Sequence, residues 1–297
     1  MPWVGPMATP NFKQELTGCF GQPVAENPTQ VMMEAAYRHH GLDYRYLTIE
    51  VAPAHLAAAV AGARAMGFRG FNCTIPHKVA VIPFLDGLGE SAALMGAVNC
   101  VVRRGDQLVG ENTDGKGFVE SLQRLRDPAG ARVMILGAGG AARAVAVELA
   151  LSGAAALTVV NRSAARGEAL AALLSGKVRE RLGRPLEVRF VPWQGDVVVP
   201  ADADVLVNTT SNGHFPDLEA RGPLDVASLR PGMVVADVIP NPPRTRLVRD
   251  AEARGCRVID GLGMLVAQGR IGIQHWTGVW PDEAVMRGAL ERVFAGG

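Results

Sequence analysis

The residues that could do chemistry in the first third of the chain lie in Asn72-Cys-Thr-Ile-Pro-His-Lys78. Asn72 and Thr74 are two positions apart at the end of a predicted strand, so their side chains share one face. Lys78 falls in the first turn of a helix that Pro76 opens. Because the positive end of a helix dipole disfavours an ammonium group, we expect a lowered pKa for Lys78 and proton exchange with a hydroxyl near neutral pH. Taken alone, the position also fits a surface lysine.

A carboxylate with possible chemistry follows in Asn112-Thr-Asp-Gly115. Asp114 could work beside a lysine, or it could merely cap the helix that follows it. Asn99 could bind a substrate or be an ordinary turn residue. We expect His77 to be structural, because the sequence pairs it with no nucleophile.

A glycine-rich turn between a strand and a helix predicts a dinucleotide site. An apolar run at 133–136 is typical of a buried parallel strand, Gly137-Ala-Gly-Gly-Ala-Ala142 ends it, and an apolar helical run follows at 144–151. In this spacing Gly137 permits the tight turn, Gly139 lets the backbone approach a pyrophosphate, and Ala142 lets the helix pack closely on the strand. The alternative is a strand–helix turn that binds no ligand.

The next strand, Leu157-Thr-Val-Val-Asn161, indicates which dinucleotide binds. An NAD site usually places Asp or Glu about 20 residues after the glycines, and no carboxylate stands there. Arg162 and Arg166 offer planar cationic donors for a phosphate, which favours NADP over NAD. They could also belong to a solvated basic helix start that Ser163 caps. The predicted cofactor contacts are Gly137, Ala138, Gly139, Gly140, Ala141, Asn161, Arg162, Ser163, Arg166 and Thr209.

Composition excludes several classes of function. Lys and Arg number 30 against 29 Asp and Glu, a net charge of +1, so no basic excess points to nucleic acid or an anionic membrane. No apolar stretch is long enough to cross a bilayer. The cysteines, Cys19, Cys73, Cys100 and Cys256, have no paired spacing, which predicts reduced, mostly buried thiols of a cytoplasmic protein and no metal site. Residues 1–13 lack the pattern of a signal peptide, and we expect a loose tail there.

Strand-like and helix-like runs alternate along the chain, which predicts an α/β fold with mainly parallel pairing. Strands are expected at 16–20, 44–51, 70–74, 188–191, 205–208, 233–238 and 257–259, with a hairpin around 103–106. Helices are expected at 29–40, 53–66 and 118–125. Residues 176–185 are charged and predict an exposed extension. Two last helices should begin near Met264 and Pro281 and fold back on the first part of the chain.

These motifs, in this order, resemble the shikimate dehydrogenase family over nearly the whole chain. The matching residues are Gly21-x-Pro-Val24, Asn72-x-Thr-Ile-Pro-His-Lys78, Gly96-Ala-Val-Asn99, Asn112-Thr-Asp-Gly115, Gly137-Ala-Gly-Gly140, Asn161-Arg162, Asn208-Thr-Thr-Ser211, Asp237, Met264-Leu265 and Gln268. The lysine and aspartate motifs are each weak alone and highly specific together. The resemblance implies reversible hydride transfer between NADP and a ring hydroxyl of shikimate or a related cyclic polyol acid, in aromatic amino acid biosynthesis.

The resemblance also implies the roles of single residues. Lys78 matches the catalytic lysine and Asp114 the aspartate beside it, with no metal required. The positions that match substrate hydroxyl contacts are Asn72, Thr74, Asn99 and Gln268. Because Gln268 must then meet Lys78 across the cofactor unit, we expect two domains. Residues 1–114 and 265–297 would bind the substrate, and residues 115–264 would form a Rossmann-type NADP domain. The active site would lie in a cleft that closes by a hinge, in a monomer or homodimer.

The end of the substrate site that should hold a carboxylate departs from the family pattern. The family's Ser-x-Ser is Asn27-Pro28-Thr29 here, and its later tyrosine is Pro240. Asn27 and Thr29 can still donate hydrogen bonds, whereas Glu26 would repel a carboxylate if it pointed inward. We therefore predict a divergent enzyme that acts poorly on shikimate and better on a relative altered at this end. The alternative is that Asn27 and Thr29 mimic the two serines.

Other functions fit parts of the sequence. Quinate or another cyclitol could be the substrate. A methylenetetrahydrofolate dehydrogenase also combines a lysine with a dinucleotide domain, but the motif at 112–115 argues against it. A non-enzymatic NADP-binding sensor would be favoured by loss of Lys78 or Asp114, and both are present.

Overall fold

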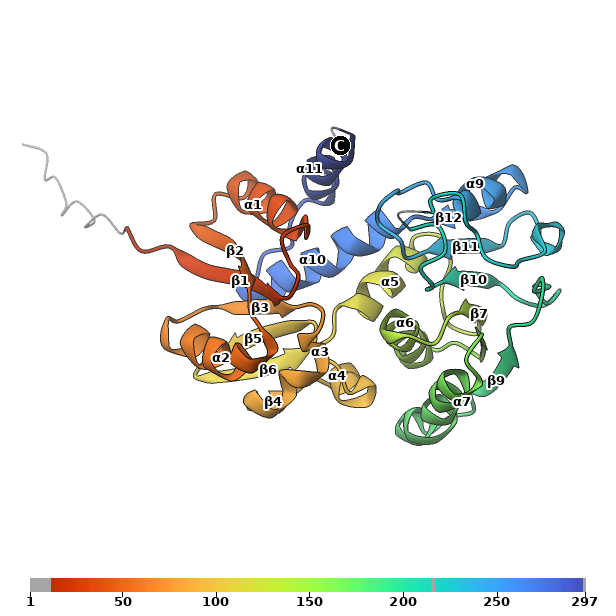
Figure 1. Cartoon of the computed structure of the whole chain (residues 1–297), viewed down its shortest axis with the longest axis horizontal. Coiled ribbons are helices and arrows are strands. Elements are labelled where there is room, and N and C mark those ends of the chain that lie inside the picture. Colours follow the sequence, from red (N-terminus) through yellow and green to blue (C-terminus); the bar gives the residue numbers. More distant parts are fainter. Residues whose placement is uncertain (1–11, 215–216, 296–297) are drawn as a thin grey trace, which may run out of the picture.

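The computed structural model describes residues 12–214 and 217–295. The chain forms two sheets, one on each side of a pair of central helices (Figure 1). The first sheet has the order β2-β1-β3-β5-β6-β4 and the second the order β12-β11-β10-β7-β8-β9. The predicted α/β class with a Rossmann-type unit is confirmed. The tail expected at 1–13 lies almost wholly outside the described residues.

The first sheet is mixed. Its strands are β1 (Glu15–Gly21), β2 (Tyr44–Glu50), β3 (Gly70–Cys73), β4 (Gly87–Leu88), β5 (Cys100–Arg104) and β6 (Gln107–Glu111). β1 pairs in parallel with β2 and β3, whereas β5 runs antiparallel to β3 and β6. The hairpin turn between β5 and β6 is too short for a crossover, so this pair must be antiparallel. The helical segments here are α1 (Thr29–His39), η1 (Pro53–His55), α2 (Leu56–Ala65), α3 (His77–Ala80), η2 (Ile82–Phe84) and α4 (Glu90–Met95).

The second sheet is wholly parallel. Its strands are β7 (Arg132–Leu136), β8 (Ala156–Asn161), β9 (Glu187–Pro192), β10 (Val205–Asn208), β11 (Val234–Asp237) and β12 (Arg257–Ile259), and its helical segments include α6 (Gly140–Leu151), α7 (Ala164–Leu173), η4 (Val226–Ser228) and α9 (Arg246–Ala253). Every residue of β10 and β11 is buried, as expected for strands covered on both faces. The strand order reverses between β7 and β10, where such sheets bind ligands.

Two helices connect the sheets, and a third packs on α1. α5 (Asp114–Gln123) packs on α6 and on α10 (Gly261–Thr277), and α11 (Glu283–Ala295) packs on α1. The last two helices therefore fold back as predicted. α10 begins earlier than expected, because the Asp260 side chain accepts a hydrogen bond from the backbone of Gly263 and caps the helix. Since α5 and α10 bridge the sheets, the boundaries predicted at 114/115 and 264/265 stay predictions.

The segment 176–185 is largely exposed, as predicted, and most of it is helical. α7 continues through a π-helical turn, η3 (Leu174–Val178), into α8 (Arg179–Leu182). The side chains at both ends of η3 are buried, and this burial favours a helix over a loop. Arg181 pairs with Glu90 of α4 at 2.6 Å, so the extension contacts a helix that accompanies the first sheet.

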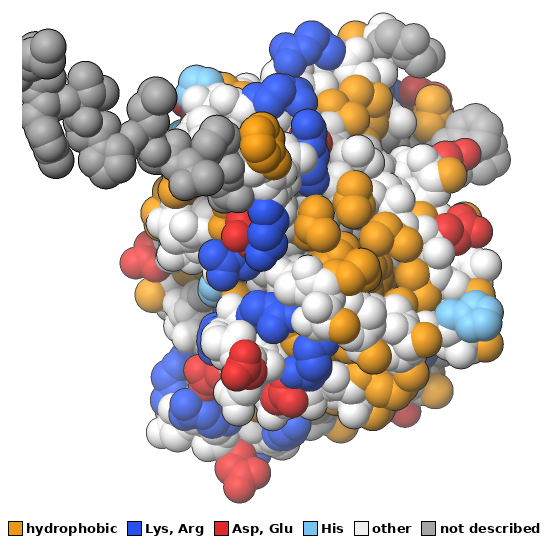
Figure 2. Space-filling view, turned by 90° about the vertical axis from the view of Figure 1, so that its left-hand side faces the viewer, with side chains coloured by type: hydrophobic (Ala, Val, Ile, Leu, Met, Phe, Trp, Pro, Cys, Tyr) orange, Lys and Arg blue, Asp and Glu red, His pale blue; other side chains and the backbone are white. Residues whose placement is uncertain are grey.

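Several large apolar side chains are exposed on the described surface. They include Val31, Leu47, Met66 and Phe84. Figure 2, which views the left-hand side of Figure 1, shows apolar side chains gathered in the middle, flanked by lysine and arginine. No helix in the described part of the chain is long and apolar enough to span a membrane. The four cysteines are free and buried, as predicted.

Candidate active site

One cavity of about 140 Å³ collects all the side chains predicted to act on the substrate. It is lined by Asn27, Thr29, Asn72, Thr74, Lys78, Asn99, Asp114 and Gln268, together with Cys19, Cys73 and Leu265. β1 and β3 deliver their carboxyl ends to this point, and α1, α3 and α5 begin there. Gln268 arrives from α10, so the fold joins it to Lys78 although the dinucleotide unit separates them in the chain.

Lys78 and Asp114 form an ion pair in this cavity. The Nζ atom of Lys78 lies 2.7 Å from Oδ2 of Asp114. Asn99 donates from Nδ2 to the other carboxylate oxygen at 2.8 Å, which fixes the carboxylate in place. The Lys78 side chain is 37 % exposed, so it can reach a bound molecule. An amine held by an oriented carboxylate can exchange a proton with such a molecule.

The expected lowering of the lysine pKa is wrong. Burial does disfavour the charged lysine, but the charge and the hydrogen bond of Asp114 outweigh it, and the pKa of Lys78 lies above its ordinary value. The prediction considered only the dipole of the short helix α3. Asp114, which raises the pKa, belongs to another element of the chain. Lys78 is therefore an ammonium group at neutral pH, which suits it to protonate an oxygen that becomes an alkoxide.

Buried amides surround the ion pair and are held by further hydrogen bonds. Asn72 donates from Nδ2 to the backbone oxygen of Asn99 at 3.0 Å and accepts the hydroxyl of Tyr46 at 2.7 Å. Asn99 accepts the backbone N–H of Thr113 at 2.7 Å. Gln268 donates to the backbone oxygen of Leu265 at 3.0 Å. These amides are therefore oriented before any substrate arrives.

The end of the cavity that departs from the family pattern carries neutral groups. Asn27 accepts the backbone N–H of Thr29 at 3.0 Å, and its Nδ2 lies 3.8 Å from the sulfur of Cys19. Burial raises the pKa of Cys19 to about 11, so this thiol stays neutral. Glu26 is exposed and does not line the cavity. Among the described lining residues Lys78 alone is cationic, and Asp114 already neutralises it.

Cys19 and Tyr46 were not predicted from the sequence as residues of the site. Cys19 lies near the end of β1, two positions before Gly21, and its contact with Asn27 could be seen only once the chain had folded. Tyr46 lies in β2 and is fully buried behind Asn72. Both are buried strand residues like many others in the core, so no local signal distinguished them.

The glycine turn after β7 has the geometry of a phosphate site. Gly137 has a φ of 112°, and a Cβ at this position would lie 2.5 Å from Oγ1 of Thr209, so only glycine fits. Open space surrounds Gly139 and Gly140 at the start of α6. Ala142, in the first turn of α6, is fully buried. The exposed backbone N–H groups at the positive end of α6 therefore suit a pyrophosphate.

The end of β8 leaves two arginines available to a ligand. Asn161 donates to the backbone oxygen of Ser163 at 2.8 Å, and Ser163 caps α7. Arg162 and Arg166 are exposed, and neither has an ion-pair partner among the described residues. The capping interpretation of Ser163 is thus confirmed, and both guanidinium groups remain free to bind a phosphate.

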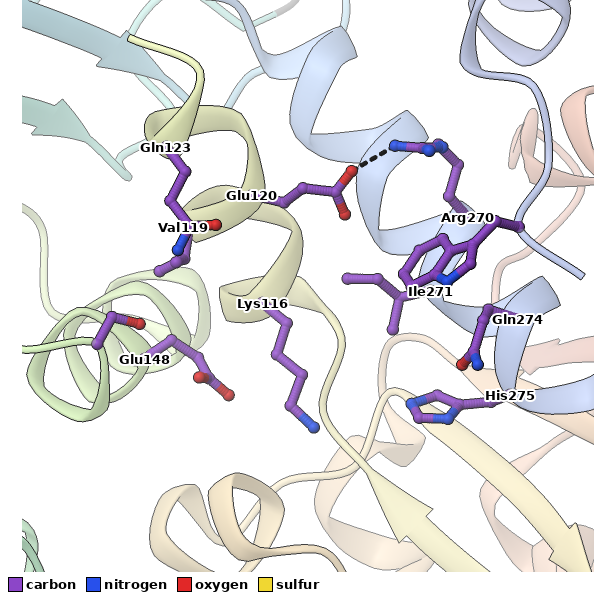
Figure 3. A pocket seen from close by; sticks show the side chains of 11 residues that line it. Lys116, Val119, Glu120, Gln123, Glu148, Arg270, Ile271, Gln274 and His275 are labelled. Carbon is purple, nitrogen blue, oxygen red and sulfur yellow. Dashed lines mark hydrogen bonds and ion pairs between the residues drawn. The ribbon is translucent and has the colours of Figure 1, made fainter. Parts of the chain in front are cut away.

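A larger cavity, of about 610 Å³, lies on the other side of α5. Lys116, Glu148 and His275 point into it from α5, α6 and α10 (Figure 3). Burial raises the pKa of Glu148 and lowers that of His275. None of the residues predicted to act on substrate or cofactor lines this cavity, so its size alone does not make it the active site.

Known protein families match the chain along most of its length. The model of the shikimate dehydrogenase substrate binding domain matches residues 19–101, that of shikimate / quinate 5-dehydrogenase matches 120–188, and that of the shikimate 5′-dehydrogenase C-terminal domain matches 261–291. A shikimate dehydrogenase (NADP(+)) of Geobacter metallireducens is 43% identical over 279 residues, which cover 93% of this chain and 95% of that protein.

Two solved structures are similar to this one over nearly their whole length. The ligand-free 5-ketofructose reductase of Gluconobacter sp. strain CHM43 has a TM-score of 0.92 and 52% identity, covering 96% of this chain and 100% of its own. A shikimate dehydrogenase in complex with NADP+ has a TM-score of 0.86 and 35% identity, covering 98% and 99%. With such matches over the whole chain, this protein belongs to the shikimate dehydrogenase family and is an NADP-dependent oxidoreductase.

Proposed function

We propose that the protein reduces a polyhydroxylated ketone that lacks a carboxylate, with 5-ketofructose as the reference substrate. The observation that carries this proposal is the neutral end of the cavity, where Asn27, Thr29 and Cys19 stand. A carboxylate buried there would meet no free cation, and burial of an unpaired charge is costly. A relative at 52% identity is named for this reduction, whereas the similar shikimate dehydrogenase structure is 35% identical.

In the proposed reaction Lys78 is the proton donor. NADPH, when bound, supplies the hydride that goes to the carbonyl carbon. The carbonyl oxygen takes a proton from Nζ of Lys78, so the ketone becomes an alcohol and the lysine becomes neutral until solvent protonates it again. Asp114 orients the ammonium group and raises its pKa, which keeps the proton in place before reaction.

The remaining cavity side chains are proposed to bind substrate hydroxyls. Asn72, Thr74, Asn99 and Gln268 surround the ion pair and present amide and hydroxyl groups. Asn27 and Thr29 would bind the hydroxyls at the far end. Neutral amides and alcohols both donate and accept hydrogen bonds, so they match a polyol without desolvating a charge.

The cofactor is proposed to lie across the carboxyl end of the second sheet. Its pyrophosphate would contact the backbone of residues 137–141 at the start of α6, where the structure leaves open space. Asn161 and Ser163 would lie beside the ribose. Thr209 would lie beside the glycine turn after β7. Arg162 and Arg166 would hold the 2′-phosphate, because both are exposed and uncommitted.

Shikimate itself is the second candidate substrate. Asn27 and Thr29 could donate two hydrogen bonds to a carboxylate in place of two serines, and the Geobacter relative is named for shikimate. In that case the protein would serve aromatic amino acid biosynthesis. For either substrate we propose a cytoplasmic enzyme, supported by four free buried thiols, acting as a monomer or homodimer.

Steady-state kinetics with NADPH would decide between the two substrates. We expect kcat/KM for 5-ketofructose to exceed that for 3-dehydroshikimate by at least about tenfold, which corresponds to one lost contact of 1.4 kcal/mol. The double variant Asn27→Ser/Thr29→Ser, which restores the family's two serines, should lower this ratio of kcat/KM values. A lower KM and a higher kcat/KM for 3-dehydroshikimate in the unchanged protein would overturn the proposal.

A further inference from the structure

Asn72 is held at both ends of its amide by groups of different kinds. Its Nδ2 donates one hydrogen to the backbone oxygen of Asn99, which can only accept. Its Oδ1 accepts the hydroxyl of Tyr46 at 2.7 Å. An amide nitrogen carries two hydrogens, so one N–H of Asn72 remains for a molecule in the cavity.

We infer that Tyr46 is a positioning residue for substrate binding, which acts by fixing the amide of Asn72. Tyr46 itself does not line the cavity. The inference rests on the proposed role of Asn72 as a substrate contact. It extends the substrate site into β2, a strand in which no site residue was predicted.

Tyr46 is rigid enough for this role. The side chain is 0 % exposed, and its ring lies 6.2 Å from the ring of Trp276. Its backbone N–H donates to the carboxylate of Glu34 at 2.7 Å, which anchors the strand at this residue. Burial holds the pKa of the phenol well above its usual range, so the hydroxyl keeps its proton and remains a donor.

Loss of the phenol would release the amide. In Tyr46→Phe, Oδ1 of Asn72 becomes a buried acceptor without a partner, and such an acceptor rotates toward any donor it can reach. The N–H that faces the substrate then turns with it. Because the contact of Asn72 is present in both the bound substrate and the transition state, its loss should raise KM more than it lowers kcat.

The test compares Tyr46→Phe with Tyr37→Phe, a matched control. Tyr37 is also buried, at 1 % exposed, and its hydroxyl lies 2.9 Å from Oγ1 of Thr17, away from the cavity. With whichever of the two ketones the unchanged protein reduces better, Tyr46→Phe should raise KM about 3- to 10-fold and leave kcat within about twofold. Tyr37→Phe should leave both within about twofold, even if it melts earlier.

A double-variant cycle separates positioning from general destabilisation. If Tyr46 acts through Asn72, then adding Tyr46→Phe to Asn72→Ala should raise KM no further. Equal KM changes in the two tyrosine variants, or additive changes in the cycle, would overturn the inference. The substrate preference of the unchanged protein tests the proposed function separately, because the tyrosine comparison can be read on either ketone.

Discussion

Gly117 in α5 lies directly against the backbone of Gln268 in α10. A Cβ added at Gly117 would lie 2.6 Å from the backbone nitrogen of Gln268 and 3.0 Å from its Cα. Asp114 begins α5, and Gln268 lines the cavity from α10. The absence of a side chain at Gly117 therefore sets how closely the two helices bring Asp114 and Gln268 together.

Replacing this glycine should separate the two helices. The neighbour of the new methyl group in Gly117→Ala is backbone, which cannot move aside cheaply, so we expect a loss of about 1–3 kcal/mol in the free energy of unfolding. KM should rise as Gln268 moves. Denaturant unfolding and steady-state kinetics measure the two effects. The control is Gly176→Ala, where the new Cβ meets no atom within 4 Å. Equal stability of the two variants would contradict the close approach of the helices.

Cofactor preference should depend on the two exposed arginines after β8. Removing Arg162 or Arg166 takes away a charge-assisted contact to the 2′-phosphate, which is worth about 1.5–3 kcal/mol. The Kd for NADPH should therefore rise about 10- to 150-fold, whereas the Kd for NADH should change little. Titration calorimetry with both cofactors measures this. Arg179→Ala, an exposed arginine of α8, is the control. Equal losses of affinity for NADPH and NADH would show that the arginines do not bind the 2′-phosphate.

The alkaline limit of ketone reduction should depend on Asp114. Because the folded pKa of Lys78 lies above its ordinary value, the charged form needed as acid is fully present below that ordinary value and is lost only as pH rises through the raised one. Asp114→Asn removes the attraction and leaves burial, which lowers the pKa. We expect the alkaline limb of kcat to move to lower pH in Asp114→Asn. Asp86→Asn, at a half-exposed pair with Arg64, is the control. If the alkaline limb of kcat lay at the same pH in Asp114→Asn as in the unchanged protein, another group would set it.

Local sequence signals predicted the parts of the site that are themselves local. The glycine turn at 137–142, with a strand before it and a helix after it, depends on neighbouring residues, and its geometry follows from them. The same holds for Ser163 as the cap of α7. The segment 176–185 is exposed, as its charges predicted, whereas its helical form follows from the buried side chains at both ends of η3.

Contacts between distant elements decided what the sequence could not. The direction of the Lys78 pKa depends on Asp114, which lies in another helix. That Gln268 shares a cavity with Lys78 was expected only from a resemblance to a family. Tyr46 resembles any core tyrosine until Asn72 is placed beside it. Packing between elements, rather than local propensity, sets these relationships.

The variant Lys78→Ala tests whether Lys78 transfers the proton to the ketone. Single-turnover oxidation of bound NADPH with a saturating ketone isolates the chemical step from binding. We predict a rate about 10²–10⁴-fold below that of the unchanged protein, with the Kd for NADPH within about twofold. A Lys78→Ala rate within about threefold of the unchanged protein would contradict this role of Lys78, because the proton would then come from another group.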